Sequence, residues 1–457
     1  MNVDKIMALV LYYTLFKNTL FEEQLALPNN AFGIFSTIRR NIKLAMYPYD
    51  IYGCIGYYTR DFNILSQQDL QSNMLTVGHN SLWLDDRRHY HPSIQLIPES
   101  MLELDFMLYP IYFINSIGII DSLNVPFNNV DFGIIIQTNK TKVMNSATYL
   151  PGVFPDMSFQ DIIPSLKRKA GIHNDSYTIY AYKIKQIKAS FISILNNEYY
   201  SKYTLKNYVN LMLSNVNLNN RYPFFYMKQG NSYLWNDTDD VRNIATLSAV
   251  YTYILYLYLN ITDNISIKNK IISIKNKIIN ITENISEYSS QALSFLGSLY
   301  PKLKLHNMDF CIKLLRDLPT ADLEFAQPEI IIGLHSAQCD MSIIPLDYDS
   351  HDSIFKLNWL IQAHLYLKAS IPKELIRLMN IKIKELLPNL KTTETNYLAV
   401  AFEALCCAKT LTTELFILFY ELEQRKSGNL YHFLNKTARV DITGHILNGL
   451  YNNLNIN

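Results

Sequence analysis

Glycine and cysteine are scarce in this sequence, with 14 and 5 residues among 457. A small and odd number of cysteines does not suit a disulfide framework, so we expect a reducing, cytoplasmic environment. The sequence contains no P-loop, GxGxxG, CxxC pair, HExxH or Gly-x-Ser-x-Gly motif. These absences exclude the familiar signatures of nucleotide, zinc and serine-hydrolase sites, and they leave the identity of any cofactor unknown.

An excess of either charge is also missing, because 41 lysines and arginines face 40 aspartates and glutamates. Such a balance supplies no strong field for nucleic acid or an anionic membrane, so we expect no nucleic-acid partner. The most apolar stretch, 244–259, contains threonine and serine and is shorter than the roughly 18–20 residues of a membrane helix. We therefore expect no membrane span. The apolar N-terminal stretch, 1–20, carries Asp4 and Lys5 and predicts a buried helix.

The composition favours a folded chain of two domains. Hydrophobic residues make up 49 % and charged residues 18 %, and 457 residues exceed one ordinary core. The many tyrosines (33), with frequent asparagine and isoleucine runs, fit an AT-rich coding genome, as in some large DNA viruses and protists.

The first part, 1–193, mixes helix and strand patterns and predicts an α+β domain. Gly171 stands where a helix C-cap is expected, and Gly133 is interpreted as a mark of a bulge. We predict helices over 1–17 and 158–170, and strands over 31–38, 53–58, 100–113, 132–137 and 177–189.

The second part, 194–457, predicts an all-α domain of paired helices, either an α/α toroid, a helical-repeat array or a plain bundle. Residues 265–285 hold an exact seven-residue repeat and a degenerate third copy, interpreted as a low-complexity insert or as a coiled contact with a partner. The predicted helices cover 205–213, 241–259, 288–300, 354–367, 373–387, 397–408 and 414–424.

Five short blocks in the first part follow one another in a recognisable order. They are Asn30-Ala31-Phe32, Gly53-Cys54-Ile55-Gly56, Asp85-Asp86-Arg87-Arg88, the run Ser-Ala-Thr-Tyr-Leu-Pro-Gly-Val at 146–153, and the helix end at 165–171. Together they resemble the AMMECR1-like domain family, over 1–189 and nothing beyond. The resemblance implies an α+β fold with a cleft and, because such domains accompany radical-enzyme and dioxygenase-like domains, action on a small molecule.

Two positions depart from the family pattern. Tyr52 stands where the family has arginine before Gly-Cys, and Asp131 stands in the block where it has histidine before a late strand. An activity that depends on either residue would be altered in this chain.

Cys54 is the leading candidate for chemistry, as a nucleophile or a ligand. Gly53 and Gly56 let other groups approach the backbone, whose N–H groups beside the thiol form a candidate oxyanion site. The alternative is a small thiol packed at a tight turn.

Charged and polar residues add weaker candidates. Arg87 and Arg88 are predicted to anchor an anion, and Thr148 to line the pocket with its hydroxyl. Asp86, His89 and His91 offer metal-ligand types at short spacing, although the sequence identifies no further ligand and a solvated loop with Arg–Asp pairs is the preferred interpretation.

Three functional hypotheses follow. The first is a two-domain protein that binds or modifies a small molecule in a cleft near Cys54. The second is a non-catalytic interaction module whose helical domain recruits a protein partner. The third is a glycan-active toroid, suggested by acidic residues near Asp239 at a predicted helix start.

Overall fold

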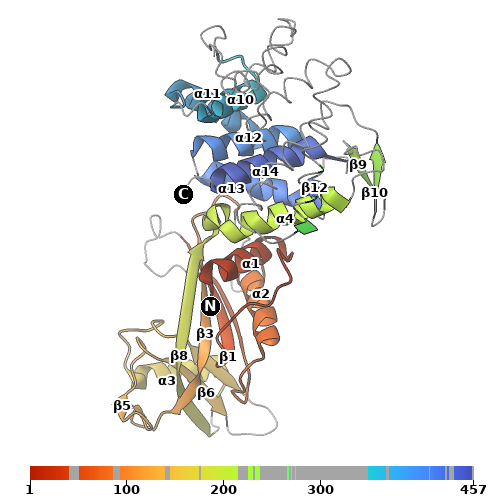
Figure 1. Ribbon diagram of the computed structural model, residues 1–457. Coiled ribbons are helices and arrows are strands. Elements are labelled where there is room, and N and C mark those ends of the chain that lie inside the picture. The colour runs from red at the N-terminus through yellow and green to blue at the C-terminus, as the bar shows by residue number, and fades with distance from the viewer. Residues whose placement is uncertain are drawn as a thin grey trace, which may run out of the picture. The chain divides into compact units, whose positions relative to one another are not determined.

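The computed structural model divides the chain into two units, Met1–Ile194 and Leu195–Asn457, each of which is described by itself (Figure 1). Apart from a few isolated positions between 265 and 273, the described residues are 1–40, 51–85, 93–138, 145–173, 176–214, 225–229, 232–236, 348–366, 370–410, 412–427, 430–431 and 437–454. The heptad insert and the predicted helices 241–259 and 288–300 lie outside them. Among the described residues, no helix combines the length and hydropathy that a membrane crossing requires.

The first unit is an α+β domain built on one curled, antiparallel sheet, with strand order β2-β1-β3-β8-β6-β7. The predicted strands are confirmed to within a few residues, and the separate β4 (Ile119–Ile120) and β5 (Val125–Pro126) form a two-residue ladder. The main strands are β1 (Ala31–Arg39), β2 (Ile51–Tyr58), β3 (Met101–Phe113), β6 (Gly133–Thr138), β7 (Ser146–Tyr149) and β8 (Tyr177–Ser190).

Helices cover the sheet at both ends of this strand order (Figure 1). Helix α1 (Val3–Phe16) is buried around most of its circumference and packs on α2 (Gln67–Trp83), which lies against β1 and β2. Helix α3 (Phe159–Ala170) covers β6 and β7 and ends at Gly171, whose φ of 66° is the predicted left-handed C-cap. The sequence reading missed α2, whose mixed polar and apolar residues give no clear periodic stripe.

The pairing register places chemically distinct rows across the sheet. Directly paired residues share a face, so Gly56, Phe35, Asp105 and Gln186 form one row over β2, β1, β3 and β8. The curl of the sheet brings its two edge strands together, because the Tyr58 hydroxyl of β2 donates a hydrogen bond to Ser146 Oγ of β7 at 2.8 Å. This row therefore faces the interior of the curled sheet, which resembles an incompletely closed barrel.

Gly133 does not mark a bulge, contrary to the prediction. It lies in the regular β6–β8 ladder opposite Tyr182, and a Cβ atom there would lie 2.3 Å from Tyr182 Cζ. The glycine is needed because the Tyr182 ring crosses β6 at this point.

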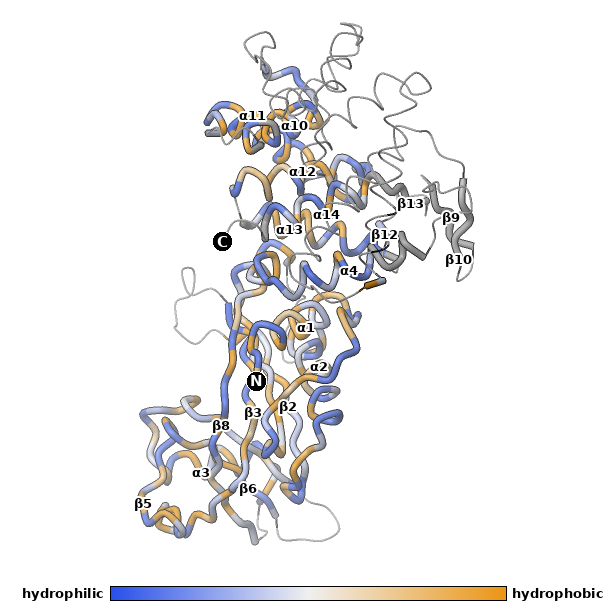
Figure 2. Tube along the Cα trace, in the orientation of Figure 1, coloured by the Kyte–Doolittle hydropathy of each residue, from blue (hydrophilic) through white to orange (hydrophobic). Residues whose placement is uncertain are grey.

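The second unit is helical, and five predicted helices are confirmed. They are α4 (Glu198–Ser214), α10 (Ile354–Tyr366), α11 (Lys373–Leu386), α12 (Thr395–Ala408) and α13 (Thr412–Gln424), and a helix that was not predicted, α14 (Val440–Leu454), follows them. Figure 2 shows hydrophobic and hydrophilic residues alternating around α11, as expected for a helix with one buried face.

The prediction of an exclusively α-helical second domain is wrong. Strands β9 (Phe225–Gln229), β10 (Ser232–Asn236) and β13 (Thr437–Arg439) form a three-stranded antiparallel sheet. Aromatic residues dominate β9 and β10, and such residues favour strands over helices. A two-residue ladder, β11 (Lys426–Ser427) with β12 (Leu430–Tyr431), adds to it.

Helix α12 is the buried centre of this unit, with α10, α13 and α14 packed around it. Its Glu403, 2 % exposed, accepts hydrogen bonds from Asn358 Nδ2 of α10 at 2.7 Å and Asn448 Nδ2 of α14 at 2.6 Å. His445 Nδ1 of α14 lies 2.7 Å from the same carboxylate. A buried carboxylate with these partners fixes how α10 and α14 are rotated against α12.

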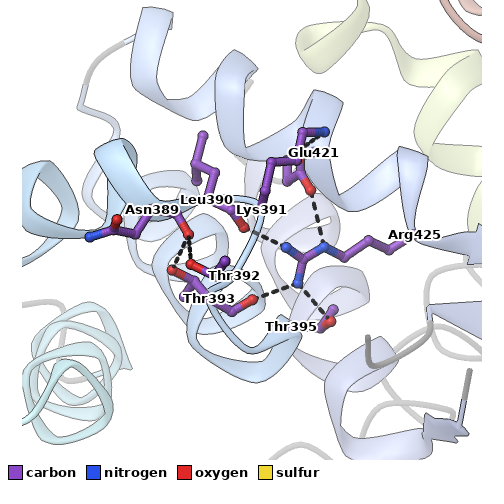
Figure 3. A network of polar contacts seen from close by, with 8 residues as sticks. All are labelled: Asn389, Leu390, Lys391, Thr392, Thr393, Thr395, Glu421 and Arg425. Atoms are coloured by element: carbon purple, nitrogen blue, oxygen red, sulfur yellow. Dashed lines mark hydrogen bonds and ion pairs between the residues drawn. The ribbon is translucent and has the colours of Figure 1, made fainter. Parts of the chain in front are cut away.

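Arg425, just after α13, holds the connection between α11 and α12 (Figure 3). Its guanidinium donates to Glu421 Oε1 at 3.2 Å, to the carbonyl oxygens of Leu390 (2.5 Å) and Thr393 (2.7 Å), and to Thr395 Oγ1 (3.0 Å). The planar five-donor group matches this spread of acceptors, which one lysine ammonium cannot reproduce.

We predict that Arg425→Met lowers the free energy of unfolding of the helical unit by about 2–4 kcal/mol, because one oxygen of the buried Glu421 carboxylate and two carbonyl groups lose the donor that Arg425 supplies. Urea unfolding read by pulsed hydrogen exchange of α12 peptides measures this loss. Lys391→Met is the control, since Lys391 pairs with the same Glu421 but has a side chain that is 79 % exposed. Equal effects of the two variants would contradict the assigned role of Arg425.

Candidate functional site

A cavity of about 360 Å³ lies in the first unit between the two edge strands of the sheet. One wall comes from β1, β2 and Asp85, two residues beyond the end of α2, and the other from β7, the turn after it and α3. The lining residues are Phe35, Ile51, Tyr52, Gly53, Cys54 and Asp85 on the first wall, and Thr148, Tyr149, Leu150, Val153 and Lys169 on the second. Three of the predicted site residues, Gly53, Cys54 and Thr148, are thereby brought together.

Cys54 stands on the edge of β2 with its half-buried thiol in the cavity wall. It is paired with Thr37 of β1, whose hydroxyl donates to Cys54 Sγ at 3.2 Å. The Cys54 N–H points away from β1 and donates to Asp85 Oδ2 at 2.8 Å. This amide is therefore already used, which removes it from the candidate oxyanion site expected from the sequence.

Lys169 supplies the cationic group of the opposite wall. Its ammonium donates to the carbonyl oxygen of Thr148 at 2.8 Å and lies 4.5 Å from the centroid of the Tyr149 ring. The Tyr149 hydroxyl in turn lies 3.0 Å from Ser165 Oγ of α3. Lys169 was not among the site residues predicted from the sequence, because only the fold brings α3 against β7.

Thr148 lines the cavity, but its hydroxyl already has two partners. Thr148 Oγ1 donates to the carbonyl oxygen of Ile134 at 2.9 Å and lies 2.8 Å from the Tyr182 hydroxyl. Tyr182 is fully buried and also donates to the carbonyl oxygen of Tyr149 at 3.2 Å. Burial raises the pKa of Tyr182, so it stays a neutral hydrogen-bonding strut behind β7.

The structure explains why residue 56 is a glycine, which the sequence did not reveal. A Cβ atom at this position would lie 2.2 Å from Cδ1 of the Phe35 ring, which leans across β2 from the neighbouring strand. Phe35 lines the cavity, so Gly56 sets the position of part of the cavity floor.

Asp105 is a buried carboxylate on the same interior face, and the sequence reading missed it. It is 2 % exposed, pairs with Phe35 across the sheet and accepts a hydrogen bond from Gln186 Nε2 at 2.9 Å. Burial raises the pKa of Asp105 to about 6, the charge of Glu103 adds to the rise, and Gln186 and Arg39 oppose it. The sequence signal for Asp105 is the pair of carboxylates, Glu103 and Asp105, at alternate positions of an otherwise apolar strand.

Several predicted residues lie outside the described part of the chain. They are the proposed anion anchors Arg87 and Arg88, the weak metal candidates Asp86, His89 and His91, and the acidic residues near Asp239. Within the described residues, no group of three or more histidine, cysteine, aspartate or glutamate side chains could hold a metal ion. Asp131, at the departure from the family histidine, accepts from Asn128 Nδ2 at 3.1 Å in an exposed turn.

The solved structures that resemble this chain include a weak neighbour of uncharacterised function. No protein-family model and no curated protein matches the chain. The crystal structure of the uncharacterized protein PH0010 from Pyrococcus horikoshii is 16 % identical, with a TM-score of 0.31. The match covers 41 % of this chain and 88 % of that one.

We predict that Gly56→Ala lowers the free energy of unfolding of the first unit by about 1–3 kcal/mol, because the added methyl displaces the Phe35 ring. Pulsed hydrogen exchange of β2 peptides across a urea series measures the change. In a Phe35→Ala background the same substitution should cost less than about 1 kcal/mol, because the obstructing ring is gone. Additive costs in the double variant would show that Phe35 is not the reason for the glycine.

We predict that Asp105→Asn stabilises the first unit at pH 7 by about 1–3 kcal/mol, with the gain vanishing toward pH 4. The pKa is raised on folding from 3.8 to about 6, so the folded chain binds more protons than the unfolded chain within this window. The free energy of unfolding of the natural protein therefore falls as pH rises through the window and stays lower above it.

The measurement is the urea midpoint of β3 peptides at several pH values, read by pulsed exchange at one fixed pH. Asp61→Asn, which changes an exposed carboxylate of the same unit, is the control. A destabilising Asp105→Asn at pH 7 would mean that the ionised carboxylate is needed by its neighbours.

Proposed function

We propose that the first unit is an AMMECR1-like domain that binds a small molecule in the cavity between β2 and β7. The observation that carries this proposal is the convergence of the two most characteristic stretches. Gly53-Cys54 on β2 and Thr148-Tyr149-Leu150 on β7 lie far apart in sequence, yet both line one cavity. A polar and apolar lining around about 360 Å³ is typical of small-molecule sites.

Binding is better supported than covalent chemistry at Cys54. The thiol lines the cavity, which suits contact with a ligand. A nucleophile also needs a donor for the oxyanion, and the neighbouring Cys54 N–H is bonded to Asp85. We therefore assign Cys54 first as a ligand-contacting residue, and second as a nucleophile if a ligand displaces Asp85 from the amide.

Tyr52 stands where the AMMECR1-like family has arginine, and another cation, Arg40, lies close to it. The guanidinium carbon of Arg40 lies 4.8 Å from the centroid of the Tyr52 ring, and Tyr52 lines the cavity. This geometry is a cation–π contact. In our proposal Arg40 compensates in part for the charge that Tyr52 does not carry.

We assign a separate role to the helical unit. Its packed helices suit the recruitment of a protein partner, and a helical repeat or an α/α toroid would extend the described helices. In the alternative function the first unit is itself a non-catalytic interaction module. That alternative predicts that a Cys54→Ala protein retains every cellular phenotype.

We predict that iodoacetamide alkylates Cys54 in the native protein at least about tenfold faster than Cys406 and Cys407, because burial slows reaction of those thiols. Cys54 is partly exposed, whereas the other two are 2 % and 1 % exposed in α12. Peptide mass spectrometry of a time course gives the three rates in one sample. Equal rates would place the Cys54 thiol away from any accessible cavity.

A ligand of the cavity should slow alkylation of Cys54 and leave the urea-unfolded rate unchanged. Screening a fragment library by this protection tests the binding function directly. If Cys54 reacts rapidly and no compound protects it, the small-molecule function fails and the interaction module is favoured. A Cys54→Ser variant that still binds the protecting compounds would separate binding from covalent chemistry.

A further inference from the structure

Opposite charges lie on the two walls of the cavity. Asp85, 6 % exposed, places its carboxylate against the outward N–H of Cys54 on β2. Lys169 places its ammonium against the carbonyl oxygen of Thr148 on β7. Because β2 and β7 are the first and last strands of the sheet order, each charge belongs to a different wall.

Each charge has a structural purpose that agrees with its sign. Edge strands present unpaired backbone groups, which proteins cover with charged side chains or other chain segments. The carboxylate accepts from one N–H group of β2 and the ammonium donates to one carbonyl oxygen of β7, so each covers one backbone group of its edge. These contacts hold both charged groups at the cavity wall, where a bound molecule meets them.

The charge pattern discriminates between ligands. A ligand with only a negative charge is attracted by Lys169 and repelled by Asp85. A ligand with only a positive charge is attracted by Asp85 and repelled by Lys169. A molecule with both charges pairs with both walls. The rest of the lining includes the apolar and aromatic side chains of Phe35, Ile51, Leu150 and Val153, which suit a hydrophobic side chain of the ligand.

We infer that the cavity selects a dipolar molecule of amino-acid type, with its carboxylate toward Lys169, its ammonium toward Asp85 and an apolar side chain on Phe35 and Leu150. The inference rests on the proposed small-molecule function and adds the substrate class to it. The charge-assisted contacts at both ends supply the selectivity, and the apolar body supplies contact area.

The test compares compounds with the same body and different charges. The probes are the standard protein amino acids, their N-acetyl derivatives, which keep only the carboxylate, and their decarboxylated amines. Binding to the full chain is measured by calorimetry and by protection of Cys54 from iodoacetamide. At least one apolar amino acid should bind about tenfold or more tighter than either singly charged counterpart, since each loses one charge-assisted contact.

Two charge-removing variants assign the charges to their walls. Lys169→Gln should weaken the bound amino acid by about tenfold or more and should not weaken the amine, for which Lys169 is only a repulsive charge. Asp85→Asn should weaken the amino acid equally and should not weaken the N-acetyl derivative, which Asp85 repels, while the amide oxygen still accepts from Cys54 N–H. Arg168→Gln, which removes an exposed cation from the same turn of α3, is the matched control and should change nothing.

The outcomes separate this inference from the proposed function. If library compounds protect Cys54 but amino acids show no advantage over singly charged counterparts, the dipolar selectivity is wrong and the binding function stands. If amino acids bind to both Lys169→Gln and Asp85→Asn as tightly as to the natural protein, the charges have been assigned to the wrong residues. If no compound of any charge protects a reactive Cys54, the proposed function itself fails.

Discussion

The curl of the six-stranded sheet, which brings its first and last strands face to face, is the constraint on which the first unit depends. A flat antiparallel sheet would leave β2 and β7 as two distant open edges. Here the Tyr58 hydroxyl reaches Ser146 Oγ across the gap, and both edges line one cavity. The register of every intervening strand contributes, because a slip of one residue would turn the interior row of any strand outward.

The interior of the curl is unusually polar for a protein core, and this has an energetic consequence. Asp105, Thr148 and Tyr182 are all buried, and each has a hydrogen-bond partner from a neighbouring strand. The apolar Phe35 and Met107 lie among them, so the network is divided rather than continuous. Burying Asp105 costs stability at neutral pH, and perturbed carboxyl groups of this kind cluster near functional cavities. The position of Asp105 beside the cavity-lining Phe35 agrees with that tendency.

Local patterns predicted the elements better than they predicted the site. Strand alternation identified β1, β3 and β8, and the Gly171 cap identified the end of α3, because these signals are contained in a few adjacent residues. The polar helix α2 and the strands β9 and β10 were not predicted, since tertiary packing and the strand preference of aromatic residues determine their structure.

In the candidate site, Cys54 and Thr148 were predicted from their motifs. Lys169 and Asp105 were not, because their importance arises from strands that only the fold brings together. The motif alone could not show that Gly56 makes room for the Phe35 ring, since Phe35 lies on another strand.

Side-chain covering of the two edges explains why the cavity persists. Had another strand covered either edge, continuous backbone hydrogen bonds would have filled the gap between β2 and β7. Asp85 and Lys169 instead cover single backbone groups, one N–H on β2 and one carbonyl oxygen on β7. Each such contact contributes only about 1–3 kcal/mol, so a ligand that offers equivalent groups can share or replace it. The same two residues can therefore both protect the strand edges and recognise a ligand. Their charges have opposite signs because Asp85 accepts from an N–H group of β2, whereas Lys169 donates to a carbonyl oxygen of β7.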